Sequence, residues 1–105
     1  ISYADLQWVA TGERLTERTF ADYRKRGGLV IMHMIPGPVV DIALAHPLVL
    51  ISSDGLTFTT GGEHPRGAGN FARVLGHYVR EKRLLSLMDA LAKMTLLPAL
   101  RLEAQ

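Results

Sequence analysis

Hydrophobic residues in this chain follow two patterns. Two apolar runs, residues 29–34 and 49–51, are bounded by glycine, proline or small polar residues and are too short for helices. Such runs are typical of strands buried on both faces of a sheet. Other segments place apolar residues three and four positions apart, which is typical of amphipathic helices. The pattern therefore predicts two strands set among about four helices.

Signals at the helix ends define the first two helices. Thr16 is a suitable N-cap and Gly27 a suitable stop, so a helix is expected over residues 16–26. Pro38 can occupy the first position of a second helix that continues over residues 39–45. Residues 1–15 show no sustained period and are expected to be extended or irregular.

The second half of the chain is predicted to be helical. Asn70 can cap a helix, and Ser86 with Asp89 resembles a capping box that opens another. Pro98 starts a short final segment. The helix after Asn70 carries its apolar side chains on one side, at Phe71, Val74, Leu75, Tyr78 and Val79.

The order strand, short helix, strand indicates a βαβ unit over residues 29–51. Its two strands should be parallel and joined by a right-handed crossover. Two parallel strands and four helices cannot cover both faces and both edges of a sheet, although these strand sequences require burial. Either the chain oligomerises through strand edges, or it is the end of a larger α/β domain.

The second predicted strand leads into the stretch with most candidate chemistry. Asp54 follows it in the turn-forming sequence Ser-Ser-Asp-Gly, and a loop of about 18 residues, long by the standards of compact domains, then runs to Asn70. Asp54 is either a functional carboxylate or an ordinary turn residue. His64 lines a site or is simply exposed. Arg66 binds a ligand or pairs with Glu63 or Asp54 as a structural clip.

Composition narrows the function classes. The 105 residues are 48% hydrophobic and 21% charged, enough for one modest domain. Without cysteine there is no disulfide, thiolate metal site or cysteine nucleophile. A net charge of +2 without a basic, aromatic-rich stripe argues against a nucleic-acid partner. No membrane-spanning run or signal peptide is visible, so a cytoplasmic location is the default expectation.

One ordered block carries a family resemblance. It consists of Ser53-Asp54-Gly55, His64-Pro65-Arg66, Gly69, Phe71, Arg73-Val74-Leu75-Gly76, Tyr78-Val79-Arg80-Glu81, Lys93-Met94-Thr95, Pro98-Ala99 and Arg101-Leu102, with Thr11-Gly12-Glu13-Arg14-Leu15 and His46-Pro47 upstream. This block resembles the C-terminal part of the N-acyl-D-amino-acid deacylases, the D-aminoacylase branch of the amidohydrolase superfamily. The resemblance runs over nearly the whole chain.

The resemblance implies a fold. The family has a (β/α)8 barrel with a small attached β-sandwich, so residues 29–34 and 49–51 would be the last two barrel strands. Residues 1–105 would then form one partial domain, the last two βα units of a barrel, incomplete as a standalone domain. Asp54 would lie at the C-terminal end of the final strand, the face on which barrel enzymes place their chemistry. The start at Ile1-Ser2, without an initiator methionine, also suggests a piece cut from something larger.

The resemblance also implies a reaction. In such enzymes zinc binds and activates water, which attacks the amide carbonyl of an N-acyl-D-amino acid. Asp54 would be the general base that takes the proton from this water and passes it to the leaving nitrogen. Arg66 would clamp the substrate α-carboxylate. His64 would orient the loop or line the pocket.

The metal ligands of that family are not visible in this sequence. There is no His-x-His pair and no group of His, Asp and Glu with ligand spacing. The chain alone is therefore expected to bind no catalytic zinc and to hydrolyse nothing. It would act when completed by the rest of a barrel, in the same polypeptide or in a partner chain. The alternative is a small α/β module that forms homo-oligomers through strand edges or a helix face, without catalysis.

Overall fold

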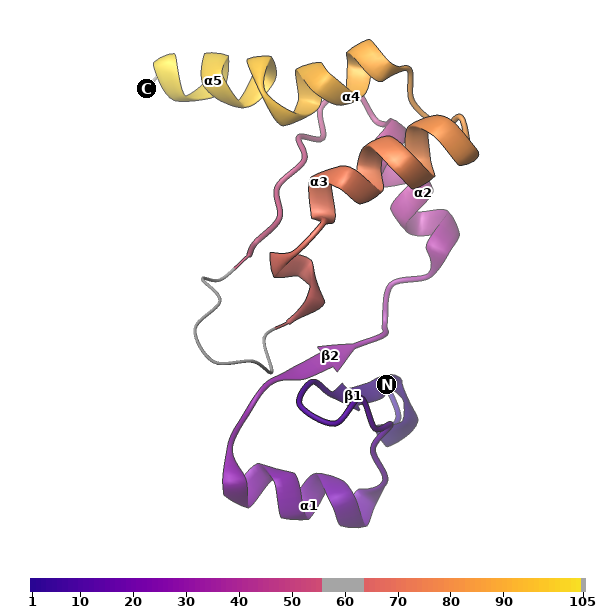
Figure 1. The fold of residues 1–105 in the computed structure, drawn as a ribbon, viewed down its shortest axis with the longest axis vertical. Coiled ribbons are helices and arrows are strands. Elements are labelled where there is room, and N and C mark those ends of the chain that lie inside the picture. Colours follow the sequence, from indigo (N-terminus) through magenta and orange to yellow (C-terminus); the bar gives the residue numbers. More distant parts are fainter. Residues whose placement is uncertain (56–63, 105) are drawn as a thin grey trace.

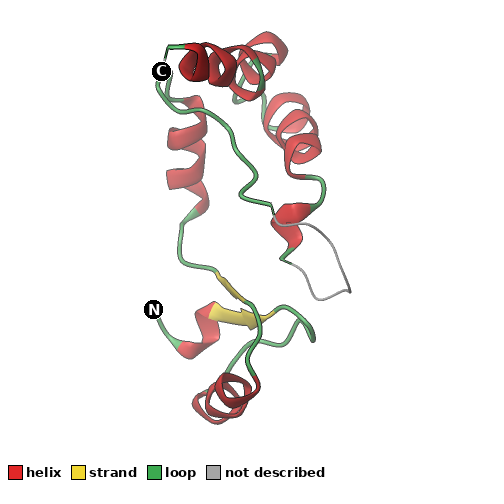
Figure 2. Cartoon of the chain, turned by 90° about the vertical axis from the view of Figure 1, so that its left-hand side faces the viewer, coloured by secondary structure: helices red, strands yellow, loops and turns green. Residues whose placement is uncertain are grey.

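The computed structural model describes residues 1–55 and 64–104. One end of the molecule holds the two strands and the first helix, and the other holds the later helices (Figure 1). Figure 2 shows the same division by secondary structure. The elements are, in order, η1 (Tyr3–Asp5), β1 (Leu6–Trp8), α1 (Glu17–Arg26), β2 (Val30–Met32), α2 (Gly37–Ala45), η2 (Pro65–Gly67), α3 (Asn70–Arg73), the π-helix η3 (Val74–Glu81), α4 (Leu87–Met94) and α5 (Leu96–Glu103).

The strands β1 and β2 form an antiparallel two-stranded sheet, with Gln7 opposite Ile31. The predicted parallel pair is therefore wrong for the described residues, and β1 lies in a segment that was expected to be irregular. β2 is shorter than predicted, and Met32 at its end is exposed. Hydrophobic pattern identified β2 as a strand but could not identify its partner, because pairing depends on contacts distant in sequence.

Residues 49–51, the second predicted strand, form no strand. Ile51 is buried, whereas Leu48 is 85% exposed and Leu50 is also exposed. The backbone N–H of Ile51 donates to the carbonyl of Lys93 in α4 at 3.2 Å, in place of a sheet neighbour. An apolar run specifies burial but no pairing partner, and here the run is held against α4 and not against a strand.

Local capping signals located the helices well. Thr16 caps α1, accepting from the backbone N–H of Thr19 at 3.2 Å. Ser86 caps α4 in the same way, accepting from the N–H of Asp89 at 3.1 Å. Three starts differ from prediction: α2 begins at Gly37, Gly69 rather than Asn70 is the N-cap of α3, and α5 begins two residues before Pro98.

The strand end of the molecule is held by stacked rings. The rings of Trp8 and Tyr23 lie 4.5 Å apart between centroids and 14° from parallel, joining β1 to α1. Gly28 lies directly against the indole, because a Cβ placed on it would be 2.3 Å from Trp8 Cζ2. The Tyr23 hydroxyl donates to Glu13 Oε2 at 2.9 Å. This cluster therefore holds Gly28, which precedes β2, against β1 and α1.

The helical end has a small core. Ile51, Val74, Leu85 and Ala90 are its buried members. The radius of gyration is 16.6 Å, against about 13 Å for a compact chain of this length. Many large apolar side chains are exposed, and in the part of the chain described here no helix is long and apolar enough to span a membrane.

Candidate functional site

Asp54 and Arg66, twelve positions apart, are in direct contact. The Arg66 guanidinium donates through Nε to the backbone carbonyl of Asp54 at 2.7 Å, and its terminal nitrogen lies 3.0 Å from Asp54 Oδ2. Asp54 has a φ of 48°, in the left-handed region that aspartate tolerates better than most residues. The next N–H, of Gly55, donates to Ser53 Oγ at 3.1 Å. This turn therefore directs the backbone carbonyl oxygen and the carboxylate Oδ2 of Asp54 towards the same arginine.

Two further contacts join the segments on either side. A Cβ on Gly55 would lie 3.2 Å from Gly67 Cα, so the backbones approach closely at that position. The Asn70 side-chain amide donates to the carbonyl of Ser52 at 3.3 Å, and Gly69, not Asn70, is the N-cap of α3. We call residues 52–55 and 64–70, joined in this way, the clasp. Residues 56–63 of the predicted long loop lie outside the described residues.

His64 lies in the clasp at the start of η2. Its Nδ1 accepts from the backbone N–H of Arg66 at 3.2 Å, so this ring nitrogen carries no proton in the bonded arrangement. Partial burial lowers the pKa of His64 from its ordinary 6.5, the Arg66 cation lowers this pKa further, and the Asp54 carboxylate opposes the shift. His64 is thus a half-buried ring whose neutral form is favoured.

His33, just beyond β2, is close enough for its charge to help lower the pKa of His64. Its Nε2 lies 2.8 Å from Gln7 Oε1, while the Gln7 amide nitrogen donates to the carbonyl of Gly12 at 2.8 Å. From the sequence, His33 between Met32 and Met34 either faces the site or is a satisfied core or strand-end histidine. The apolar run of residues 29–34 predicted a strand that ends near His33. No local pattern indicated that this strand would end near His64.

The Asp54–Arg66 ion pair is exposed to solvent. The side chain of Arg66 is 40% exposed and that of Asp54 is 80% exposed. An ion pair of this kind contributes about 0–1 kcal/mol to stability. Of the two partners expected for Arg66 as a structural clip, Asp54 is the one observed, and Glu63 lies outside the described residues. Both charged groups are accessible and can exchange partners at small energetic cost.

Metal ligands are not gathered at the clasp. Among the described residues no group of three or more His, Asp or Glu side chains is arranged to hold a metal ion. Asp54 and His64 are therefore two isolated candidate groups, and a zinc ligand set of three or four does not fit the side chains described here.

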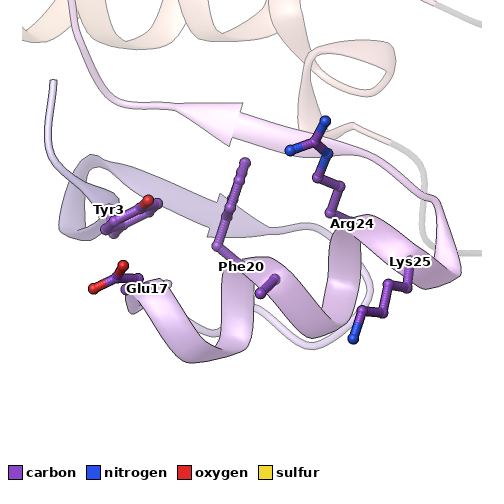
Figure 3. A pocket seen from close by; sticks show the side chains of 6 residues that line it. Tyr3, Glu17, Phe20, Arg24 and Lys25 are labelled. Atoms are coloured by element: carbon purple, nitrogen blue, oxygen red, sulfur yellow. The ribbon is translucent and has the colours of Figure 1, made fainter.

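Two cavities are relevant to the clasp. One, of about 530 Å³, is open and is lined by η1 and α1, with Tyr3, Glu17 and Phe20 among its residues (Figure 3). None of its lining residues belongs to the clasp. A smaller one of about 210 Å³ is lined by Ser52 and Asn70 of the clasp together with Leu44 and Val74. Two clasp residues, Ser52 and Asn70, thus border a concave surface shared with α2 and η3.

The sequence is similar to three curated enzymes of Alcaligenes xylosoxydans xylosoxydans. It is 54% identical to an N-acyl-D-glutamate deacylase over 54 residues, 51% of this chain. It is 50% identical to an N-acyl-D-aspartate deacylase over 60 residues, 57% of this chain. It is 45% identical to a D-aminoacylase over 71 residues, 68% of this chain. The resemblance inferred from the ordered block is confirmed.

This similarity covers a small part of each relative. The chain spans 11%, 12% and 14% of the lengths of the three enzymes, respectively. No family model matches the chain, and no solved structure matches it. The comparisons therefore relate the chain to one part of much longer proteins.

Proposed function

We propose that this chain is part of an amidohydrolase that cleaves the amide bond of N-acyl-D-amino acids. Its similarity to three deacylases of that substrate class supports the proposal. The observation that carries it within this chain is the contact of Asp54 with Arg66, a proton acceptor and a carboxylate-binding cation held together in one exposed turn. In this proposal the chain belongs to the C-terminal part of a (β/α)8 barrel, although here β2 pairs antiparallel with β1 and residues 49–51 form no strand.

Asp54 is the general base and acid of the proposed reaction. It takes a proton from the attacking water as the new C–O bond forms at the amide carbonyl, and returns a proton to the nitrogen as the C–N bond breaks. The products are a carboxylate and a free D-amino acid. The turn conformation of Asp54 and the Arg66 contact fix the carboxylate, and its exposure leaves it accessible to substrate.

Arg66 binds the α-carboxylate of the substrate in this proposal. A guanidinium offers a fork of donors that matches a carboxylate. Because the Asp54–Arg66 pair is exposed, an arriving α-carboxylate can take over one donor while Nε stays on the Asp54 carbonyl. Substrate binding then frees the Asp54 carboxylate for proton transfer. His64 supports the backbone N–H of Arg66 and lines the site.

Zinc would supply an activated water in the complete enzyme. Its ligands would come from residues beyond this chain, since the described side chains form no ligand set. The chain alone is therefore expected to be inactive.

The test is a deacylase assay on two proteins, this chain alone and the complete polypeptide whose reading frame contains it. Substrates are N-acetyl-D-glutamate, N-acetyl-D-aspartate and N-acetyl-D-methionine, with the L-enantiomers as controls. We expect zinc-dependent release of D-amino acids from the complete polypeptide and none from the chain alone. Turnover by the chain alone would contradict its expected inactivity, and no turnover by the complete polypeptide would contradict the proposed reaction.

A second candidate function is a non-catalytic module that oligomerises. Exposed apolar side chains favour it: Leu48 is 85% exposed, and Phe71 of the proposed helix face is also exposed. The two-stranded sheet has two edges of its own. Light scattering on the isolated chain tests this candidate, because a monodisperse monomer would contradict association through strand edges or the Phe71, Leu75 and Tyr78 face.

A further inference from the structure

Lys93 of α4 is a buried charged side chain, only 5% exposed. Its ammonium donates to the backbone carbonyl of Val49 at 2.8 Å and to that of His46. The backbone carbonyl of Lys93 accepts from the N–H of Ile51. One residue therefore makes three hydrogen bonds to the backbone of residues 46–51.

The Lys93 ammonium and the backbone carbonyls of residues 46–51 both need these hydrogen bonds. A buried ammonium is costly unless its N–H groups are hydrogen-bonded, and in the described part of the chain Lys93 has no carboxylate partner. Residues 46–51 have no strand neighbour in the described chain, so Lys93 satisfies two of their carbonyls. His46 is also the C-cap of α2, where a cation interacts favourably with the helix dipole.

The segment held by Lys93 leads directly to Asp54. Ile51 is anchored to α4 and lies in the small core with Val74, and Asp54 follows three residues later. From the other side, Arg66 and Asn70 hold Asp54 and Ser52 across the clasp. Asp54 is thus held between α4 on one side and the clasp on the other.

We propose that Lys93 is a positioning residue for Asp54, acting through its hydrogen bonds to residues 46–51. This inference rests on the proposed function for its catalytic consequence. The structural part, that Lys93 immobilises residues 46–54, can be tested whether or not the reaction is correct.

The first measurement is amide hydrogen exchange on the isolated chain. In Lys93→Met the apolar stem is kept and the ammonium is lost, so we expect exchange over residues 49–54 to rise about tenfold or more while α1 is unchanged. Lys82→Met is the matched control. Lys82 is another lysine that contacts the α2 region, donating to Asp41 Oδ1 at 2.7 Å, but it makes no bond to residues 46–51.

Lys93→Arg covers the case in which Lys93→Met does not fold. The guanidinium keeps the charge and the donors, so exchange over residues 49–54 should lie between the values for the unsubstituted chain and for one without the ammonium. If Lys93→Met folds and leaves exchange over these residues within twofold of the Lys82→Met value, the proposal is wrong. If only Lys93→Arg folds, exchange over these residues equal to that of the unsubstituted chain contradicts the proposal.

The second measurement is activity of the complete polypeptide. We expect Lys93→Met to lower kcat about 10- to 100-fold with little change in KM, because a small displacement of a catalytic group is costly. Lys93→Arg should recover part of this loss. A fall confined to thermal stability, with kcat per folded molecule unchanged, would overturn the positioning role. Inactivity of the unsubstituted polypeptide would refute the proposed reaction, whereas the exchange result would stand separately.

Discussion

Arg66 holds Asp54 by two different oxygens, donating through Nε to its backbone carbonyl at 2.7 Å and approaching its carboxylate to 3.0 Å. The first bond fixes the position of the turn, and the second fixes the direction of the side chain. Only the second competes with a substrate carboxylate. The two contacts therefore separate structural and chemical roles of the same arginine, and substitutions can distinguish them.

Asp54→Asn should abolish activity of the complete polypeptide and leave folding nearly unchanged. Asparagine also tolerates the left-handed conformation that Asp54 adopts, and the ion pair that is lost is exposed. We expect kcat to fall about 100-fold or more, as for loss of a general base, with a stability change within about 1 kcal/mol. Steady-state kinetics and thermal unfolding measure both.

Asp22 is an exposed aspartate of α1, and Asp22→Asn is the matched control, which should change neither kcat nor stability. If Asp54→Asn keeps more than half of the activity, Asp54 is a turn residue and not the base.

Arg66→Gln should mainly weaken substrate binding. Loss of the guanidinium removes the donor fork for the α-carboxylate, so we expect KM for N-acetyl-D-glutamate to rise about tenfold or more. Arg101→Gln, at an exposed position of α5, controls for loss of charge alone. An unchanged KM in the Arg66 variant would assign Arg66 to the structural contact with Asp54 only.

The pKa of His64 should respond in opposite directions to its two charged neighbours. Arg66→Gln removes a cation that lowers it, so this pKa should rise, whereas Asp54→Asn removes an anion that raises it, so it should fall. NMR titration of the His64 ring proton in the two variants and the unsubstituted chain measures these shifts. Equal pKa values in all three proteins would show that the clasp does not form.

Clasp stability should depend on pH through the same ring. The folded pKa of His64 lies below the ordinary value of 6.5, so the unfolded chain binds the proton at higher pH. Stability from this group is therefore complete above pH 6.5 and declines as pH falls below it towards the folded pKa. Denaturant unfolding across pH 5 to 7.5, compared with His64→Gln, should show a slope that the variant lacks.

Gly28→Ala should disrupt the strand end of the molecule. Its Cβ would lie 2.3 Å from the Trp8 ring, and the φ of +144° is unfavourable for alanine. We expect a loss of about 2 kcal/mol or more. Gly27→Ala is the matched control, because its φ of +74° is also strained but a Cβ meets nothing within 4 Å.

The chain has one tryptophan, so Trp8 fluorescence during denaturant unfolding reports on this end directly. A Gly28 variant no less stable than the Gly27 variant would contradict the close contact with the indole.

Local signals in the sequence were sufficient for the helices. Thr16 and Ser86 were predicted as caps and serve as caps, because a cap bonds to a backbone N–H only three residues away. The candidate residues Asp54, His64 and Arg66 come from the sequence through the resemblance of the block around Asp54, and their roles stay predictions. Three helix starts differ by one or two residues from those predicted, at Gly37, Asn70 and Leu96.

Tertiary structure alone decided how the strands pair and what surrounds Asp54. An apolar run specifies burial but no partner, so residues 29–34 yielded β2 paired with an unexpected β1, and residues 49–51 were bound by Lys93 instead of a strand. The sequence by itself determined the helix caps at Thr16 and Ser86, because a cap bonds to a backbone N–H three residues away, and it supplied the candidate residues through the family resemblance. The antiparallel sheet, the Arg66 contact and the Lys93 anchor join residues that are 12 to 47 positions apart, and only the folded chain brings such residues within bonding distance.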